Sequence, residues 1–189
     1  MSMTKCILAL LVVFVVACGA AGADKNNVSI AISGGIFAPI DSTVKDDFGN
    51  YWPRVSFKTF EATRPQEWRF TAEIAGFHLK TSDLILDGTK EARLIPITAG
   101  MERGLAEYRR LQPYVTIRGG PYFGRFRDTT PDIDINHRRT GLNVHASLGT
   151  IVQRRFYIEA RYDYFSSLSG YNFDGFSISA GMRLFDIPF

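Results

Sequence analysis

The last fourteen residues, "FSISAGMRLFDIPF" (176–189), alternate between apolar side chains and small or polar ones. The apolar set is Phe176, Ile178, Ala180, Met182 and Leu184, and the other set is Ser177, Ser179, Gly181 and Arg183. Successive side chains of a β-strand point to opposite faces. The stretch therefore predicts a strand with one apolar and one polar face, and the fold depends on which of the two faces meets water.

The same two-residue period recurs in seven earlier segments, which we predict as strands at 28–33, 54–58, 69–74, 95–102, 115–118, 142–149 and 156–164. No later segment shows a convincing 3.6-residue helical period or an apolar run of 18 residues. Longer polar connections at 41–50, 80–91, 127–139 and 166–172 alternate with shorter ones at 62–66, 106–110 and 152–155. An antiparallel meander of eight strands would collect the long connections at one end and the tight turns at the other.

The first residues predict export. Lys5 precedes an apolar run at 7–16, and Ala21, Gly22 and Ala23 provide the small residues that signal peptidase requires, so we expect a signal peptide at 1–23 and a single domain at 24–189. The apolar run is shorter than the roughly 20 residues of a membrane-spanning helix. Residues 15–18 also resemble a lipobox, which would make Cys18 a lipidation site. Both cysteines of the chain, Cys6 and Cys18, lie in this leader, so the exported domain would contain no disulfide.

Charge gives no support for nucleic-acid binding. Without Lys5, 21 basic and 19 acidic residues remain, a formal charge of +2, and the basic residues are dispersed along the chain. A nucleic-acid-binding domain would show a clustered basic patch or a recognisable motif.

Two exported architectures fit eight alternating strands. A lipocalin-like soluble barrel buries its apolar face inside, whereas an outer-membrane barrel turns that face toward lipid. The polar face here carries small residues beside opposite charges, which suits an interior only just wide enough for its side chains. The sequence also lacks a lipocalin-like Gly-x-Trp near the first strand and a C-terminal helix. We therefore predict an all-β, eight-stranded antiparallel up-and-down transmembrane β-barrel, and keep the soluble periplasmic ligand-binding barrel as an alternative.

This prediction assigns each face. The expected lipid-facing residues are Ile97, Val115, Ile117, Leu142, Val144, Ile158, Phe176, Ile178 and Met182. The expected luminal polar network consists of Arg69, Glu73, Glu102, Arg118, His145, Glu159, Arg161, Asp163 and Arg183, because buried charges need partners. Girdle aromatics at the two membrane interfaces are expected at Tyr51, Trp52, Trp68, Phe123, Phe126, Tyr164, Phe165, Tyr171, Phe173 and Phe185.

The chain from 28 to 185, including "ARLIPITAGMERGL", "LQPYVTIRGGPYFG" and "FYIEARYDYF", resembles the outer-membrane β-barrel superfamily that contains the outer-membrane protein W and opacity-protein-like families. The terminal strand resembles the signal that the barrel assembly machinery recognises, although "DIPF" extends beyond the usual ending. The resemblance implies the outer membrane of a Gram-negative bacterium, contact with its lipids, and a structural, surface-exposed or narrow-conduit role without catalysis or cofactor.

One enzymatic alternative stays open. His145 and Ser147 share a face of one predicted strand, and Glu159 on the next strand could lie opposite them, as a Ser-His-Glu hydrolase would require. The order is similar to that of the lipid A 3-O-deacylases, whose triad faces the bilayer. Here the three residues share the polar face, which favours an ordinary luminal network.

Other candidate sites are weaker. The three histidines are widely separated, and His78 and His137 are expected to be solvated, so no metal site is predicted. Asp128, Asp132 and Asp134 lack the glycine and glutamate of an EF-hand loop and predict a solvated loop. Pro96 and Pro121 fall inside predicted strands, where we expect a bulge or a strand end.

Overall fold

The computed structural model describes residues 28–61, 67–83, 88–106, 108, 110–130, 133–167 and 170–187. Its strands are β1 (Val28–Pro39), β2 (Trp52–Glu61), β3 (Trp68–Asp83), β4 (Gly88–Gly104), β5 (Leu111–Thr130), β6 (Ile133–Val152), β7 (Phe156–Phe165) and β8 (Gly175–Ile187). Each pairs antiparallel with its neighbour in sequence, and β1 pairs with β8. The result is a closed barrel, which confirms the predicted fold class.

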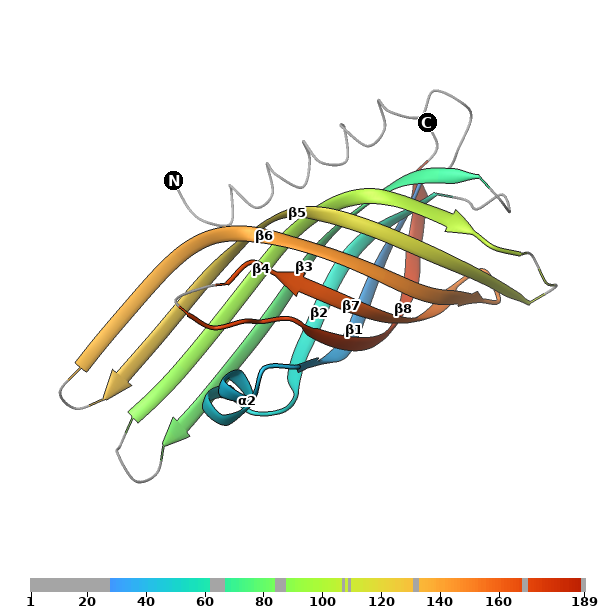
Figure 1. The fold of residues 1–189 in the computed structure, drawn as a ribbon. Coiled ribbons are helices and arrows are strands. Elements are labelled where there is room, and N and C mark those ends of the chain that lie inside the picture. Colours follow the sequence, from blue (N-terminus) through green and yellow to red (C-terminus); the bar gives the residue numbers. More distant parts are fainter. Residues whose placement is uncertain are drawn as a thin grey trace.

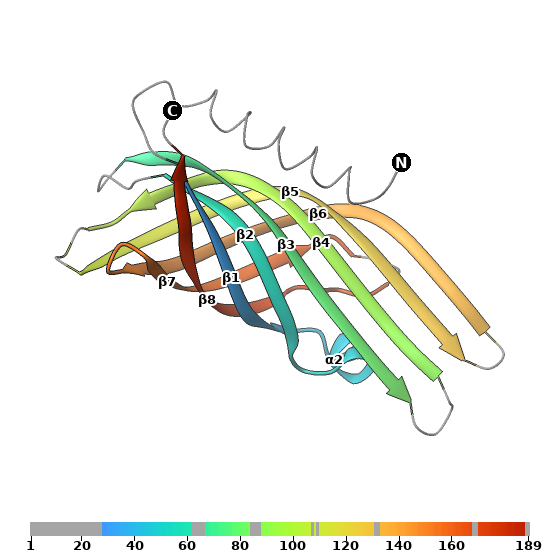
Figure 2. The ribbon, with the colours of Figure 1, turned by 180° about the vertical axis from the view of Figure 1, so that it is seen from behind.

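The barrel is asymmetric along its axis. The central strands β3 to β6 run well past the other four at the end that carries the one described helix, α2 (Ser42–Phe48) (Figures 1 and 2). Residues of the predicted loops 80–91 and 127–139 are therefore partly strand, since β3 reaches Asp83 and β5 reaches Thr130. Val28 pairs with Ile187, so the beginning of β1 and the end of β8 lie together at the opposite end.

The two faces of the wall differ in chemistry as the alternation predicted. Along β7 exposed and buried residues alternate without exception, with Ile158 outside and Glu159 inside. In β8, Ile178 is 67% exposed and Ser179 only 3%. The apolar side chains thus form the outer surface and the polar ones fill the interior, opposite to a lipocalin-like barrel.

The helix α2 was not foreseen. Asp41 caps it by accepting a hydrogen bond of 3.1 Å from the Val44 backbone N–H, and the cap leaves Val44 and Phe48 one turn apart on a single face. Both side chains are completely buried. Two apolar residues over seven positions are too few for a periodicity signal, so the stretch had been predicted as a polar loop.

An apolar cluster fills the barrel interior beneath α2. The aromatic plug, as we name it, consists of Phe37, Phe48, Trp52, Phe77, Tyr122, Phe126, Phe165 and Phe173. Its rings meet mostly edge to face at centroid separations near 5 to 6.5 Å, as between Phe37 and Phe77 at 5.1 Å. The expected girdle positions of Trp52, Phe126, Phe165 and Phe173 are therefore wrong, because these four side chains are buried in the plug. The position expected for Tyr171 is wrong as well, because its partly buried ring packs against the plug.

The expectation for the prolines is also wrong. Pro96 pairs with Tyr122 and Pro121 with Leu142, and the pairing register is the same on both sides of each proline, so neither marks a bulge or a strand end. Backbone pairing between β3 and β4 is interrupted beside Pro96, and pairing between β4 and β5 is interrupted beside Pro121. A proline has no backbone N–H to donate at these places. The described register shift lies instead between β1 and β8, at Ile30 and Ala31.

The predicted signal peptide, Cys18, Asp132 and the last two residues lie outside the described residues. Within those residues no helix is long and apolar enough to cross a membrane.

Candidate functional site

Ionic side chains fill the barrel interior beside the aromatic plug. Four basic and four acidic side chains are at most 3% exposed: Arg54, Lys58, Arg118, Arg161, Glu73, Glu102, Glu159 and Asp163. The two signs balance, as burial in a low dielectric requires. We call these eight residues, with His145, the luminal network.

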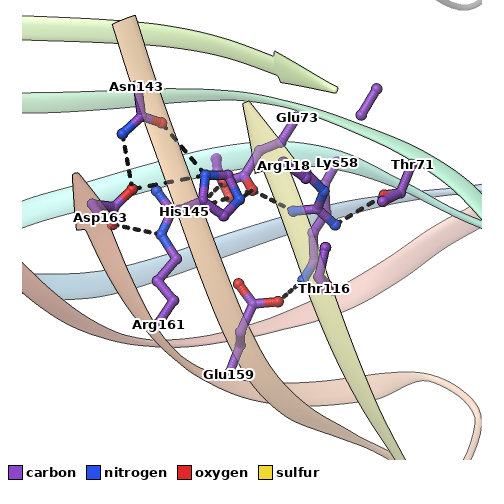
Figure 3. Close-up of polar contacts among 12 residues, drawn as sticks. Lys58, Thr71, Glu73, Thr116, Arg118, Asn143, His145, Glu159, Arg161 and Asp163 are labelled. Atoms are coloured by element: carbon purple, nitrogen blue, oxygen red, sulfur yellow. Dashed lines mark hydrogen bonds and ion pairs between the residues drawn. The ribbon is translucent and has the colours of Figure 1, made fainter. Parts of the chain in front are cut away.

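Glu73 on β3 is the centre of the luminal network. Its carboxylate accepts hydrogen bonds from Arg54, from Arg118 at 2.7 Å and from Arg161 at 3.0 Å (Figure 3). The three arginines come from β2, β5 and β7, so one carboxylate joins four strands. Charge-assisted hydrogen bonds of this kind are the strongest that side chains form.

A second ionic group surrounds Glu159. The Lys58 ammonium donates to Glu159 at 2.6 Å, and the Tyr114 hydroxyl donates to the same carboxylate at 2.9 Å. The Lys58 Nζ atom also lies 3.9 Å from the centre of the Tyr157 ring. The ammonium thus contacts the Glu159 carboxylate, the Tyr114 hydroxyl at 3.2 Å and the face of the Tyr157 ring inside the barrel.

His145 lies between the carboxylates of Glu73 and Asp163 (Figure 3). Its Nε2 is 3.7 Å from Glu73, its Nδ1 is 3.9 Å from Asp163, and Nδ1 is 3.4 Å from the Asn143 amide oxygen. Asp163 itself accepts a hydrogen bond of 2.7 Å from Arg161 Nε. These contacts assign His145 a place in the luminal network.

The remaining predicted network residues lie toward the short-turn end. Glu102 accepts a hydrogen bond of 3.4 Å from Thr116 and lies 3.7 Å from Arg118. Arg69 is 9% exposed and pairs with the exposed Glu67 at 2.7 Å, and Arg183 is only partly buried. These two arginines therefore belong to the rim of the network.

The hydrolase candidates do not assemble. Strand register places Ser147 opposite Arg161 and His145 opposite Asp163, while Glu159 lies opposite Gly149. The expectation that Glu159 lies opposite His145 and Ser147 is therefore wrong. Glu159 binds Lys58 and Tyr114 instead, and among the described residues the Ser147 hydroxyl has no hydrogen-bond partner. A triad requires the serine, histidine and carboxylate to be joined by hydrogen bonds.

No group of three metal-ligating side chains occurs in the described part of the chain. Asp134 is part of β6, where its backbone pairs with Thr129, and Asp128 is part of β5. Asp128 and Asp134 thus belong to two neighbouring strands. The two histidines predicted to be solvated, His78 and His137, are both exposed, and His78 also lies 3.1 Å from Glu91.

Five important residues were missing from the predicted network: Arg54, Lys58, Tyr114, Asn143 and Tyr157. Their position in the alternation assigns all five to the inner face. Arg54 and Lys58 are the two ends of the short strand predicted at 54–58, and Tyr114 lies just outside a strand that was predicted too short. The parity of the strand, applied to its full length, would have found them.

The predicted lipid-facing residues all point outward. Ile117, Leu142, Val144, Ile158, Phe176 and Ile178 are between 38% and 67% exposed, and Ile97, Val115 and Met182 are partly buried against neighbouring side chains. Tyr51, Trp68, Phe123, Tyr164 and Phe185 are also exposed. Exposed apolar side chains thus surround the barrel on all eight strands.

Comparison with known proteins places this fold among outer-membrane barrels. No family model and no curated protein sequence matches the chain. Similar solved structures are Ail, the attachment invasion locus protein of Yersinia pestis (18% identity, TM-score 0.57, 85% of this chain and 98% of that one), and the N-terminal β-barrel domain of Pseudomonas aeruginosa OprF (14%, 0.57, 85% and 100%). Neisserial surface protein A is also similar (17%, 0.51, 86% and 98%). All three are eight-stranded outer-membrane β-barrels, and the likeness at these identities concerns the fold.

Proposed function

We propose that this protein is an integral outer-membrane barrel of a Gram-negative bacterium whose lumen is closed and whose role is structural and surface-exposed. The single observation that carries this proposal is the inverted polarity of the wall. Charged residues such as Glu73 and Arg118 are fully buried inside, whereas Ile178, Phe176 and Leu148 are about 60% exposed outside. An apolar exterior of this extent is costly in water and favourable in lipid, where a closed barrel satisfies every backbone group.

The ends of the strands give the orientation. In bacterial outer-membrane barrels the short turns face the periplasm and the longer loops face outside. The turn from 153 to 155 and the paired ends of β1 and β8 therefore lie on the periplasmic side. The helix α2 and the extended part of β3 to β6 would project from the cell.

Two barriers in series support a closed lumen. The aromatic plug fills the outer half of the interior, and the luminal network crosses the middle between strands that are not neighbours. A conduit for small hydrophobic molecules, which resemblance to the outer-membrane protein W family would imply, needs an apolar passage. The ion pairs in the interior do not favour such an apolar passage.

The last strand would also serve in biogenesis. β8 supplies an outward apolar stripe ending near Phe185, which suits recognition by the barrel assembly machinery, and the surrounding outer-membrane lipids would be the main contact of the folded wall. A surface role also accords with Ail, whose name refers to attachment and invasion.

Cysteine labelling tests the inverted polarity directly. In a background with Cys6 and Cys18 replaced by serine, Ile178→Cys should react with a lipid-soluble maleimide carried in the bilayer and resist a water-soluble one. Ser179→Cys, a nearly isosteric change at a buried luminal position, is the matched control and should react with neither. Rapid labelling of Ile178→Cys by the aqueous reagent in folded protein, together with recovery in the soluble periplasm, would refute the membrane assignment.

A further inference from the structure

Arginines lie side by side on the outer face where the central strands leave the barrel. Arg93 on β4 pairs directly with Arg125 on β5, and Arg125 pairs directly with Arg138 on β6. His78 on β3 extends the same line, since it pairs with Arg93. We call Arg93, Arg125 and Arg138 the outer arginine row.

Strand parity places this row on the outer wall. Its members alternate with inward-facing residues such as Leu94 and Phe126, which are buried. Ile95 and Phe123 lie on the same face, each two positions closer to the barrel than Arg93 and Arg125. Their exposed fractions are 42% and 50%. Two residues of a strand correspond to roughly 7 Å. The row therefore begins where the apolar exterior ends.

Among the described side chains the row has few counter-charges. On this outer face its three arginines lie beside one described carboxylate, Glu91. Glu91 is bonded to Arg93 and lies 3.1 Å from His78. Arg125 donates to the neutral Asn136 at 3.3 Å. Like charges at directly opposed positions destabilise a sheet, so their arrangement suits an anion that is supplied from outside.

We propose that the outer arginine row binds the phosphate groups of a phosphorylated lipid in the outer leaflet. This inference rests on the proposed function, because the row lies at the boundary of the membrane only if the apolar wall is in lipid. Guanidinium groups bind phosphate bidentately. The location selects a lipid over a soluble anion: the side chains leave the wall directly above Ile95 and Phe123, where the head group of a lipid packed against those residues would lie.

The test compares two triple variants of the full mature chain in detergent micelles by native mass spectrometry with diphosphorylated lipid A as the probe. The three changes Arg93→Gln, Arg125→Gln and Arg138→Gln together should weaken lipid A binding by on the order of a hundredfold. Each arginine near an anionic lipid surface contributes a similar share of the binding free energy. Arg110→Gln, Arg154→Gln and Arg155→Gln remove the same charge from exposed positions at the short-turn end and should change the affinity less than about threefold. Equal losses in the two variants would overturn the proposal.

Further arms separate the possible anions. Lipid A with its phosphates removed should bind the wild-type protein as weakly as intact lipid A binds the outer-row variant. Inorganic phosphate should displace lipid A only at concentrations far above those of the lipid, and displacement at equal concentration would show a site for free phosphate. A soluble heparin fragment that binds in an arginine-dependent way more tightly than lipid A would reassign the row to a sulphated polysaccharide.

A loss of lipid A binding that comes from misfolding is recognised by measuring the resistance of the variant to urea. The outer-row variant should be as resistant to urea as the wild type in lipid-free micelles, or more so, because it removes repulsion between opposed positions. If Ile178→Cys labelling shows a lipid-facing wall but lipid A binding does not depend on the row, the inference fails and the membrane proposal stands. If the labelling fails, the membrane proposal itself is lost.

Discussion

Arg118 donates a hydrogen bond of 2.7 Å to Glu73 across the barrel interior, although the strands that carry them, β5 and β3, are separated by β4. Neither side chain is more than 1% exposed. The bond joins two parts of the wall that backbone pairing alone connects only through a third strand. Cross-barrel contacts of this kind add to the backbone pairing of β1 with β8 that closes the wall.

Removal of the Glu73 charge should destabilise the barrel strongly. Glu73→Gln leaves the guanidinium groups of Arg54, Arg118 and Arg161 with one anion fewer, and breaking a buried ion pair costs about 3 to 5 kcal/mol. The measurement is urea unfolding in bilayers, followed by heat-modifiable migration. Glu67→Gln, which removes an exposed partner of Arg69, should cost less than about 1 kcal/mol. A similar cost for the two variants would contradict the central place of Glu73.

Lys58 and Glu159 should be energetically coupled. Either Lys58→Met or Glu159→Gln alone leaves its partner's charge buried, whereas the double variant removes both charges. We expect each single change to cost about 3 to 5 kcal/mol and the double change to cost clearly less than the sum. A double-mutant cycle of unfolding free energies measures the coupling, and additive costs would show that the 2.6 Å contact contributes nothing.

The outer wall should reject charge in a bilayer. Ala180 is exposed on the outer wall between Ile178 and Met182, so Ala180→Arg should cost about 2 to 4 kcal/mol near the membrane midplane. Arg154→Ala in an exposed turn is the control and should have little effect. A soluble barrel with water outside would tolerate an exposed arginine at 180, so an unchanged unfolding free energy would argue against lipid contact.

Closure of the lumen should survive loss of the aromatic plug. Phe48→Ala with Trp52→Ala removes two buried rings at the outer end, yet the luminal network still crosses the interior. We expect silence in planar bilayers from the wild type and from this variant alike. Steady conductance from the wild type would refute the closed lumen, whereas conductance from the variant alone would show that the plug is the only effective barrier.

Docking of α2 should weaken in acid. Burial alone would raise the pKa of the Asp47 carboxyl, but hydrogen bonds from Lys90 at 2.5 Å and Tyr171 at 2.6 Å lower it below its ordinary value. A lowered folded-state pKa contributes stability above the ordinary carboxyl pKa, and that stability is lost as the pH falls through the folded value.

Hydrogen exchange of the α2 amides in micelles tests this dependence. Protection should fall on acidification below the ordinary range of an aspartate, and Asp47→Asn should reproduce part of that loss at pH 7. Asp46→Asn changes an exposed neighbour and should leave protection unaltered. Protection that is independent of pH in the wild type would show that Asp47 does not hold the helix.

The sequence alone determined the number of strands and the face to which each side chain belongs. A period of two is a local property of an extended chain, so Ile178 and Ser179 were assigned to opposite faces without any knowledge of their neighbours. The same rule identified Glu73, Arg118 and Arg161 as interior residues. It failed where the signal was short, at α2, and where strands continued through polar residues, as β5 does after Phe126 and β6 does before Thr140.

Only the tertiary structure decided which side chains meet. Strand parity is unchanged by a register shift of two residues, so it cannot tell whether His145 faces Glu159 or Asp163, and the register chose Asp163. The girdle prediction for Trp52 and Phe165 was wrong because it used only their position near strand ends. Parity extended to those ends assigns Trp52 to the face of Arg54 and Phe165 to the face of Asp163, and both rings are buried inside. The contact between Glu73 and its three arginines depends on closing the barrel, which brings β2, β5 and β7 around one carboxylate from distant parts of the chain.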